Sequence, residues 1–355
     1  MVTVLGSGIA GTALAGALAG SGRPVTVYEQ RSGGGGGAFL ILDGRGHRGL
    51  LELGVPEDDL HAASYPVDEL RYTPDDGVTR RRPNEGHRFW LRRDLMAVLN
   101  RWAVESGAEI RYGDPVSEVR VDPAGGTTLR LGDDTVTTRE LVIGADGIDS
   151  VARAGIEPGR TTEYAGDVVV YGMTDRAVDC PTDPFVLHFD AAAGSGTRRA
   201  ATVGHIWRPG ATAALWFLRI TREPLPGAET GILPVAGWAD TVVAAAPGSV
   251  RELTAELVAA TDQVHVSNAR NVPLGSAAAP APPVVLVGDA DHAITPAAGV
   301  GAREGIEDVV AVYGAIAAGE SPAEAMSARR RAITEERDRV ARRMRAAATS
   351  GTAAR

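Results

Sequence analysis

The chain has 355 residues, more than one hydrophobic core usually supports, so we expect about two domains. Its formal net charge of −9 argues against a general nucleic-acid-binding face, and all 36 basic residues are arginine, which excludes catalysis by a lysine amine. Cys180 is the only cysteine, so an intramolecular disulfide is excluded, and no histidine spacing predicts a metal site. No stretch approaches the ~20 apolar residues of a membrane span, and we expect a cytoplasmic protein.

The N-terminal region has the pattern of a strand, a glycine-rich turn, a helix and a second strand. Residues 2–5 and 25–28 are short apolar runs typical of buried parallel strands. The glycines of the turn permit a tight bend, close approach of the backbone to a pyrophosphate, and close packing of helix on strand; the turn reads Gly6-Ser7-Gly8-Ile9-Ala10-Gly11. Glu29 lies where an acidic residue accepts from ribose hydroxyls. This unit predicts a dinucleotide site, but it does not distinguish NAD from FAD.

The middle of the chain changes from mixed elements to consecutive strands. Helices are expected over residues 46–53 and 94–104, and a strand meander over 108–143 ends in the apolar strand 141–143. Residues 163–220 then contain only strand patterns, which predicts a separate antiparallel sheet.

Parallel-sheet signals return toward the C-terminus. Residues 284–287 form a buried apolar strand, and a helix is expected over 304–317. A capping box at 321–324 opens a charged helix to about Ala346, which is predicted to be a solvated helix or a clamp across two domains. The predicted fold class is α/β, with a discontinuous Rossmann-like nucleotide domain (1–64, 90–162 and 271–320), an inserted antiparallel-sheet domain (65–89 and 163–270) and a long C-terminal helix (321–348).

Two further segments place polar residues directly after strands. Asp146 and Gly147 follow the strand 141–143. Asp289 follows the strand 284–287, and Pro296 then leads to a second glycine-rich helix start, Gly299-Val300-Gly301-Ala302. Such a helix start presents free N–H groups and a positive dipole end, as the first turn does. Two of them suit one ligand that carries charge at two places.

In order and spacing, these three segments resemble those of FAD-dependent monooxygenases of the para-hydroxybenzoate hydroxylase class. That class includes aromatic hydroxylases, polyketide-tailoring oxygenases and tetracycline-inactivating monooxygenases. The resemblance covers nearly the whole chain and includes an Arg-x-x-Leu element that begins at Arg92. It implies FAD as the cofactor, bound by Gly6, Ser7, Gly8, Ile9, Ala10, Gly11, Glu29, Gln30, Arg31, Arg92, Asp146, Gly147, Asp289, Pro296, Gly299, Val300, Gly301 and Ala302.

The resemblance also implies which part of the flavin nucleotide each residue faces. The turn 6–11 would hold the pyrophosphate, Glu29 the adenosine ribose, and Arg31 would lie beside the adenine. Arg92 would neutralise the pyrophosphate region, where a guanidinium can make two parallel hydrogen bonds. Asp146 and Gly147 would lie near the FAD and the path of the nicotinamide donor.

At the other end of the cofactor, Asp289 would accept from the ribityl chain and Pro296 would face the isoalloxazine ring. The backbone N–H groups of residues 299–302 would stabilise negative charge on the reduced flavin. Arg303 would offset flavin charge or face solvent. Three positions depart from the class: Asp291 replaces a usual small residue, Val300 a usual glutamine, and Arg303 a usual asparagine.

The implied reaction is a monooxygenation. NAD(P)H would bind transiently and reduce the flavin, which would react with O₂ to a C4a-hydroperoxide and hydroxylate or epoxidise an electron-rich, aromatic or polyketide-like molecule. No protein nucleophile is expected, and no acid or base is assigned. The inserted sheet would roof the flavin and line the substrate pocket with His188, His205, Trp207, Trp216, Phe217 and Arg219.

Other functions share part of this pattern. A nicotinamide dehydrogenase shares only the first segment, and a flavin-dependent halogenase relies on a lysine that this chain lacks. A flavin-dependent reductase and a non-redox natural-product cyclase that retains FAD as a structural element stay as alternatives, because a fold does not fix a function. NAD(P)H consumption with O₂ uptake distinguishes a monooxygenase from both.

Overall fold

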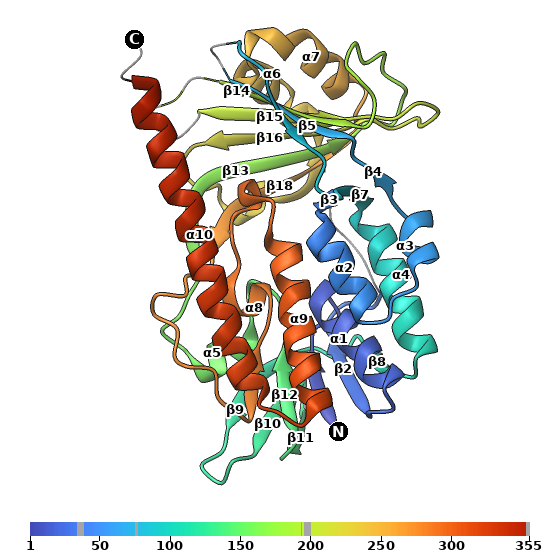
Figure 1. The fold of residues 1–355 in the computed structure, drawn as a ribbon, viewed down its shortest axis with the longest axis vertical. Coiled ribbons are helices and arrows are strands. Elements are labelled where there is room, and N and C mark those ends of the chain that lie inside the picture. The colour runs from blue at the N-terminus through green and yellow to red at the C-terminus, as the bar shows by residue number, and fades with distance from the viewer. Residues whose placement is uncertain (34–38, 75–76, 193, 195–199, 353–355) are drawn as a thin grey trace.

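The computed structural model describes residues 1–33, 39–74, 77–192, 194 and 200–352 (Figure 1). Its lower part contains a five-stranded sheet in which every pairing is parallel. In sheet order the strands are β19 (Val284–Leu286), β12 (Leu141–Gly144), β1 (Val2–Leu5), β2 (Val25–Glu29) and β8 (Glu109–Tyr112). Strands from both ends of the chain and from its middle therefore meet in one sheet, as predicted for a discontinuous Rossmann-like fold.

Both faces of this sheet are buried, because its strands are apolar on both sides. Val4 and Ile143 belong to the core on one face, while Leu5 and Val142 belong to the core on the other. Helices that pack on one another cover the first face: α1 (Ile9–Gly20), α2 (Gly44–Glu52), α3 (Glu57–Ala62), α4 (Arg92–Glu105), α9 (Gly301–Ala318) and α10 (Pro322–Thr352). The second face is covered by α5 (Val151–Ile156) and by a three-stranded antiparallel sheet of β9 (Val116–Val121), β10 (Thr127–Leu131) and β11 (Asp134–Thr138).

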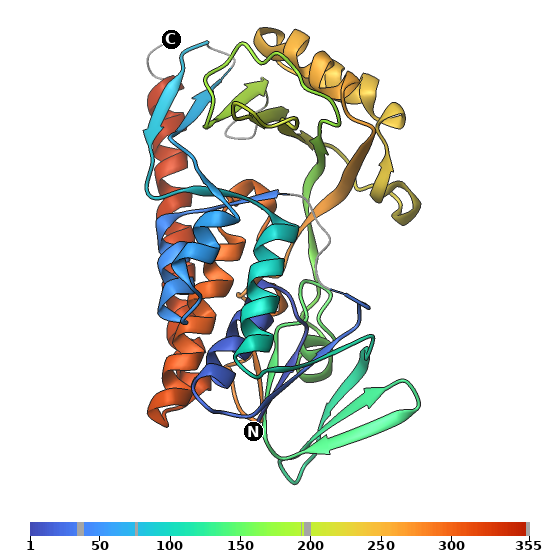
Figure 2. The same ribbon diagram turned by 90° about the vertical axis from the view of Figure 1, so that its right-hand side faces the viewer.

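The upper part contains an eight-stranded sheet in which β14 and β5 form a parallel pair and the other pairings are antiparallel. In sheet order its strands are β17 (Gly231–Pro234), β18 (Gln263–Asn271), β13 (Glu163–Met173), β16 (Leu215–Thr221), β15 (Ala201–Ile206), β14 (Val186–Ala192), β5 (Glu69–Thr73) and β6 (Arg80–Pro83). Figure 2 shows α6 (Ala239–Ala245) and α7 (Arg251–Ala259) on the side of this sheet that faces away from the lower part. We call that side the outer face and the opposite side the inner face.

A small antiparallel sheet lies between the two larger ones (Figure 1). It consists of β3 (Phe39–Leu42), β7 (Arg88–Leu91) and β4 (Tyr65–Pro66). Phe89 of this sheet packs with Leu187, Ile206 and Leu215 of the upper sheet in one apolar cluster. The inner face of the upper sheet is thereby attached to the helical layer below it. Short helical turns complete the described chain: α8 (Asp289–His292), η1 (Gly227–Glu229), η2 (Val235–Gly237), η3 (Gly248–Val250) and η4 (Pro296–Ala298).

Most elements expected from the sequence are present, with differences at their ends. The helix expected at 304–317 begins earlier, at Gly301, because the glycine-rich turn itself opens α9. The C-terminal helix continues past Ala346 to Thr352. None of the described helices combines the length and apolar character that a membrane span requires.

Candidate cofactor site

The turn between β1 and α1 depends on three glycines. Gly6 has a φ of 91°, and a Cβ there would lie 2.7 Å from the carbonyl oxygen of Ala145. A Cβ on Gly11 would lie 1.9 Å from the carbonyl oxygen of Gly6, so α1 can pack this closely only with glycine. Gly8 differs, because it has an extended backbone and nothing lies within 4 Å of its Cβ position. Open space therefore adjoins the free N–H groups of α1, where an anionic group fits.

Glu29 ends β2 beside this turn and is buried. One carboxylate oxygen accepts from the backbone N–H of Ser7 at 2.8 Å and from its hydroxyl at 3.0 Å. The other accepts from the backbone N–H of Arg31 at 2.8 Å. A carboxylate has about four acceptor positions, so Glu29 can stabilise the turn and still accept a hydrogen bond from a ligand hydroxyl. The side chains of Gln30 and Arg31 are exposed, and Ile9 and Ala10 are half-buried.

The second predicted segment lies directly against the first. β12 pairs with β1, and the Cα of Asp146 is 2.7 Å from the Cβ position of Gly6. The carboxylate of Asp146 accepts from the Ser150 hydroxyl at 2.6 Å and from the Ala152 N–H at 3.0 Å. Burial raises the pKa of Asp146, and these hydrogen bonds counteract that effect. Gly147 follows with a φ of 82°, so the chain turns sharply beside the first glycine-rich turn.

The third segment brings the start of α9 next to the start of α1. The Cβ position of Gly288 lies 3.5 Å from the Cβ of Ala10 in α1 and 3.6 Å from the Cα of Gly305 in α9. Asp289 follows directly, with a carboxylate oxygen 3.8 Å from the Cβ position of Gly301. The two glycine-rich helix starts, about 290 positions apart in the chain, therefore meet at the carboxyl edge of the parallel sheet, where ligands bind in such folds.

Arg92, the first residue of α4, interacts electrostatically with the other segments. Burial and the nearby Arg31 lower the pKa of its guanidinium, whereas Asp289 and Glu29 raise it. The side chain of Asp289 is exposed, yet desolvation by the surrounding protein raises its pKa, and His292 and Arg92 oppose that shift. Residues predicted to face the pyrophosphate, the ribose and the ribityl chain are thus brought into one region.

The turn before α9 has the features of a second open helix start. Pro296 begins a short 3₁₀ turn that ends at Gly299 with a φ of 67°, and no described side chain caps α9. Pro296 and Gly299 are exposed, and nothing lies within 4 Å of the Cβ position of Gly299. Val300, Gly301 and Ala302 are half-buried. The glycine cradles at both helix starts fit a flavin nucleotide, since each leaves room beside its amides.

Arg303, one of the three departures from the class, does not face solvent. It is buried and donates to Asp43 at 3.2 Å and to Glu336 at 3.0 Å. Arg303 therefore joins the start of α2 to α10. Nothing in the structure explains Val300.

Asp291, another departure, is fully buried within an ionic cluster. It accepts from Arg160 at 2.9 Å and from Nε of Arg330 in α10 at 2.8 Å. The sequence analysis missed this cluster because its members lie 131 and 39 positions apart. The one available signal was the arginine-rich C-terminal helix, expected either as a solvated helix or as a clamp across two domains. Its described ion pairs join α10 to α9 and to the segment before it.

His292 and Asp308 form a buried pair next to the third segment. Nε2 of His292 is 2.5 Å from one carboxylate oxygen of Asp308, and that oxygen also accepts from the Gly288 N–H at 3.0 Å. The other oxygen of Asp308 accepts from Arg329 at 3.1 Å. Burial lowers the pKa of His292, but Asp308 outweighs it and the pKa is raised. Burial raises the pKa of Asp308, but His292 and Arg329 outweigh it and the pKa is lowered. The pair fixes the backbone that carries Asp289.

The six predicted substrate residues are divided between the two faces of the upper sheet. Phe217 and Arg219 lie on the inner face of β16, where Phe217 contacts Phe39 at a ring-centroid distance of 6.3 Å and Arg219 pairs with Asp167 at 3.1 Å. Trp216 points the other way, because neighbouring side chains of a strand alternate. It is fully buried in the outer core, and its indole N–H donates to Thr261 at 3.0 Å.

His188, His205 and Trp207 also belong to the outer side. The rings of His188 and His205 stack at 4.6 Å, and His205 lies 3.0 Å from the hydroxyl of Thr182, to whose carbonyl Trp207 donates at 3.0 Å. Burial lowers the pKa of His205 to about 3, so its ring is neutral. The six residues therefore do not share one surface, and only Phe217 and Arg219 lie on the inner face.

A cavity of about 170 Å³ lies below the inner face, lined by residues the sequence analysis did not select. Tyr65, Phe89, Met173 and Leu215 contribute apolar walls, and Arg208 lies 4.7 Å from the ring centroid of Tyr65. Aromatic rings continue beside it, with centroids 5.2 to 6.3 Å apart: Phe39, Phe89, Tyr171, Phe189 and Phe217. Such a concave, aromatic surface suits a flat apolar ring.

Comparison with known proteins agrees with this geometry. No family model matches the chain. Two curated proteins named kynurenine 3-monooxygenase are similar to it: the one from Salinispora arenicola is 28% identical over 92% of this chain and 74% of its own length, and the one from Salinispora tropica is 27% identical over 92% and 75%.

Solved structures share the fold at low sequence identity. CtdE in complex with FAD and a substrate has a TM-score of 0.74 at 17% identity, covering 93% of this chain and 84% of that one. The 2,6-dihydroxypyridine-3-hydroxylase from Arthrobacter nicotinovorans has a TM-score of 0.72 at 18% identity, covering 92% and 86%. The solved structures confirm the predicted fold class, and the names of the two curated relatives confirm the resemblance to this class of monooxygenases.

Proposed function

We propose that this protein is an FAD-dependent monooxygenase that uses NAD(P)H and O₂ to hydroxylate or epoxidise an electron-rich, aromatic or polyketide-like small molecule. The observation that carries this proposal is the meeting of two open helix starts, those of α1 and α9, at the carboxyl edge of one parallel sheet. A pyrophosphate suits the first, and a ring that becomes anionic on reduction suits the second. The names of the two curated relatives support the reaction class.

In this proposal, each segment binds one part of FAD. The turn 6–11 and Arg92 bind the pyrophosphate, Glu29 binds the adenosine ribose, and Arg31, with its neighbour Gln30, lies beside the adenine. Asp289 accepts from the ribityl hydroxyls. The residues nearest the flavin ring and the nicotinamide path are Asp146, Gly147, Pro296, Gly299, Val300, Gly301 and Ala302.

When bound, FAD supplies reduction by NAD(P)H and transfer of one oxygen atom of O₂ to the substrate. The residues of the chain bind, orient and exclude water. The N-terminal amides of α9 stabilise negative charge on the ring system. The aromatic inner face, with Phe217 and Tyr171, orients a flat substrate and keeps the region dry.

We also propose a division of labour along the chain. Residues 1–64, 90–162 and 271–320 form the FAD-binding domain, residues 65–89 and 163–270 the substrate domain, and residues 321–348 a helix that clamps the first. The membership of the two large sheets and the ion pairs of α10 support this division. The lone, buried Cys180 fits a reducing, cytoplasmic setting.

The test begins with an absorbance spectrum of the purified protein, which we expect to show bound, oxidised flavin. NAD(P)H oxidation and O₂ uptake are then measured together with candidate phenols and heteroaromatic acids, with the product examined for one added oxygen atom. A colourless protein that cannot be loaded with FAD contradicts the cofactor assignment. Consumption of NAD(P)H with reduction of the substrate and no O₂ uptake identifies a reductase instead, and an FAD-loaded protein that oxidises no NAD(P)H identifies a non-redox role.

A further inference from the structure

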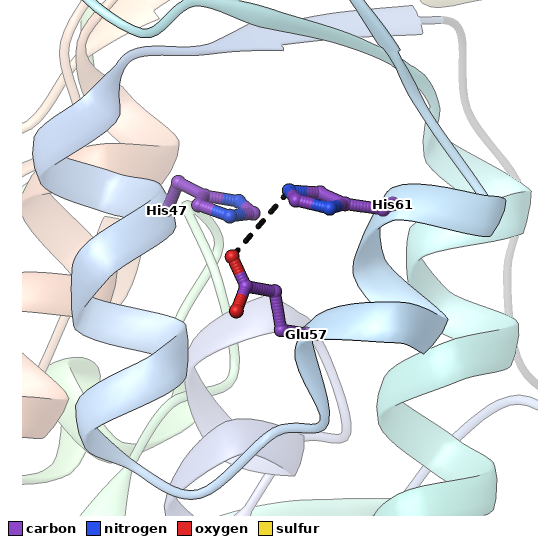
Figure 3. Close-up of side chains that lie close together, drawn as sticks. All are labelled: His47, Glu57 and His61. Atoms are coloured by element: carbon purple, nitrogen blue, oxygen red, sulfur yellow. Dashed lines mark ion pairs between the residues drawn. The ribbon is translucent and has the colours of Figure 1, made fainter.

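Three side chains from two neighbouring helices point toward one another (Figure 3). His47 comes from α2, and Glu57 and His61 lie one turn apart on α3. One possible ligand atom of each lies within 4.8 Å of the other two. The two imidazole rings are parallel within 3°, with centroids 5.3 Å apart, and Nε2 of His61 is 3.8 Å from a carboxylate oxygen of Glu57.

The ring of His47 has unused binding capacity. Its Nδ1 is buried and has no hydrogen-bond partner among the described residues. A buried ring nitrogen without a partner, next to a second histidine and a carboxylate, is available to a ligand such as a metal ion.

We propose that His47, Glu57 and His61 bind a divalent transition-metal ion of the zinc class. Two imidazoles and one carboxylate are a donor set that Zn²⁺ accepts, whereas Ca²⁺ and Mg²⁺ require oxygen ligands. Metal–ligand bonds of about 2.0–2.2 Å mean that the donor atoms draw together by on the order of 1 Å. Glu57 and His61 are exposed and free to make that movement.

A metal ion bound by these three residues would link α2 to α3. α2 packs on α9, with the Cβ position of Gly49 2.7 Å from a methyl group of Ile306. Asp43, the N-cap residue of α2, accepts from Arg303 of α9. Holding α2 in place therefore stabilises the helical layer beside the second glycine-rich turn. The positive charges of Arg88 and Arg48 near His47 oppose the binding of a cation, so we expect a moderate affinity.

The experiment is a calorimetric titration of ZnCl₂ into the untagged, full-length, FAD-loaded protein after treatment with a chelator. We expect saturable binding of one ion per chain and a rise in melting temperature on addition of Zn²⁺. His61→Gln and His47→Ala should each weaken binding by at least about 10- to 100-fold and remove the thermal shift, since a direct ligand is worth no less than its outer-shell support. Asp58→Ala, an exposed carboxylate of the same helix, and His87→Ala, a loop histidine, are the matched controls.

The titration shows whether or not these three residues bind a metal ion. His61 is exposed, so His61→Gln is expected to fold even if His47→Ala does not. Absence of saturable binding to the unaltered protein, or equal affinity in His61→Gln and Asp58→Ala, overturns the site. Flavin content and NAD(P)H oxidation are independent of this outcome, so failure here leaves the proposed function untouched.

Discussion

At the scale of single residues, a substitution of Gly8 can test cofactor binding without disturbing the fold. Its backbone is extended and its Cβ position meets no atom within 4 Å, so Gly8→Val is expected to fold normally. The added methyl groups occupy the space where a pyrophosphate approaches α1. FAD affinity should fall by at least about 100-fold, or roughly 2.7 kcal/mol. The measurement is flavin content after dialysis, with circular dichroism as the check on folding.

Gly248→Val is the control for that substitution. Gly248 also has nothing within 4 Å of its Cβ position, but it lies in the upper part of the molecule, at η3. It should retain full flavin content. A Gly8→Val protein that remains as yellow as the control would show that the pyrophosphate does not lie at α1.

The His292–Asp308 pair predicts a pH dependence of stability. The pKa of His292 is raised above 6.5 in the folded protein, so its contribution is complete below that value and is lost as the pH rises through the folded pKa. The pKa of Asp308 is lowered below 3.8, so its contribution is lost only as the pH falls through that lowered value. The free energy of unfolding, measured with urea at increasing pH, should decline in the unaltered protein but not in His292→Gln. The same change of unfolding free energy with pH in both proteins would contradict this assignment.

At the scale of elements, the alternation of side chains along β16 predicts different effects for substitutions of two adjacent aromatic residues. Trp216 is fully buried in the outer core, so Trp216→Ala should cost about 3–5 kcal/mol of unfolding free energy. Phe217 lies on the half-open inner face, so Phe217→Ala should cost less and raise the KM for the organic substrate. Denaturant midpoints and substrate-dependent NAD(P)H oxidation measure the two effects. Equal changes in KM for both variants would show that the faces are wrongly assigned.

The attachment of α10 rests on buried ion pairs, and one substitution tests it. Arg330→Ala leaves the fully buried Asp291 with Arg160 alone, and removing one partner of a buried pair typically costs about 3–5 kcal/mol. Arg339→Ala is the matched control on the same helix, because Arg339 and Glu335 form an exposed pair 3.8 Å apart. Its effect should stay below about 0.5 kcal/mol. The unfolding free energies of the two variants are measured with urea. A small loss of unfolding free energy in both would mean that apolar packing holds α10 in place.

For the whole molecule, FAD should act as a cross-link between distant parts of the chain. Its proposed ligands come from β1–α1, β2, α4 and the segment between β19 and α9. Saturation at 100 times the dissociation constant should stabilise the folded state by about 2.7 kcal/mol. ADP, which carries the pyrophosphate without the flavin, should raise the melting temperature by a smaller amount. In Gly8→Val both shifts should be lost, and a full ADP shift in that variant would place the pyrophosphate elsewhere.

Much of the lower part of the molecule could be predicted because its signals are local. The strand, turn and helix around Gly6, Gly8 and Gly11 follow from short-range sterics, and apolar runs such as 284–287 predict strands buried on both faces. The substrate side could not be predicted in the same way. His188, His205, Trp207 and Trp216 carry suitable side chains, but which face of a strand is covered by α6 and α7 depends on the partner elements, and no local pattern records them.

By itself, the sequence determined the order of the elements, the α/β class and the glycine-rich helix starts, because backbone sterics and apolar periodicity act within a few residues. Only the tertiary structure decided that the starts of α1 and α9 meet, that Asp291 lies between Arg160 and Arg330, and that His47 faces His61. Those contacts join positions far apart in the chain. Their existence depends on how whole helices and sheets pack, since burial and charge pairing are properties of the assembled fold.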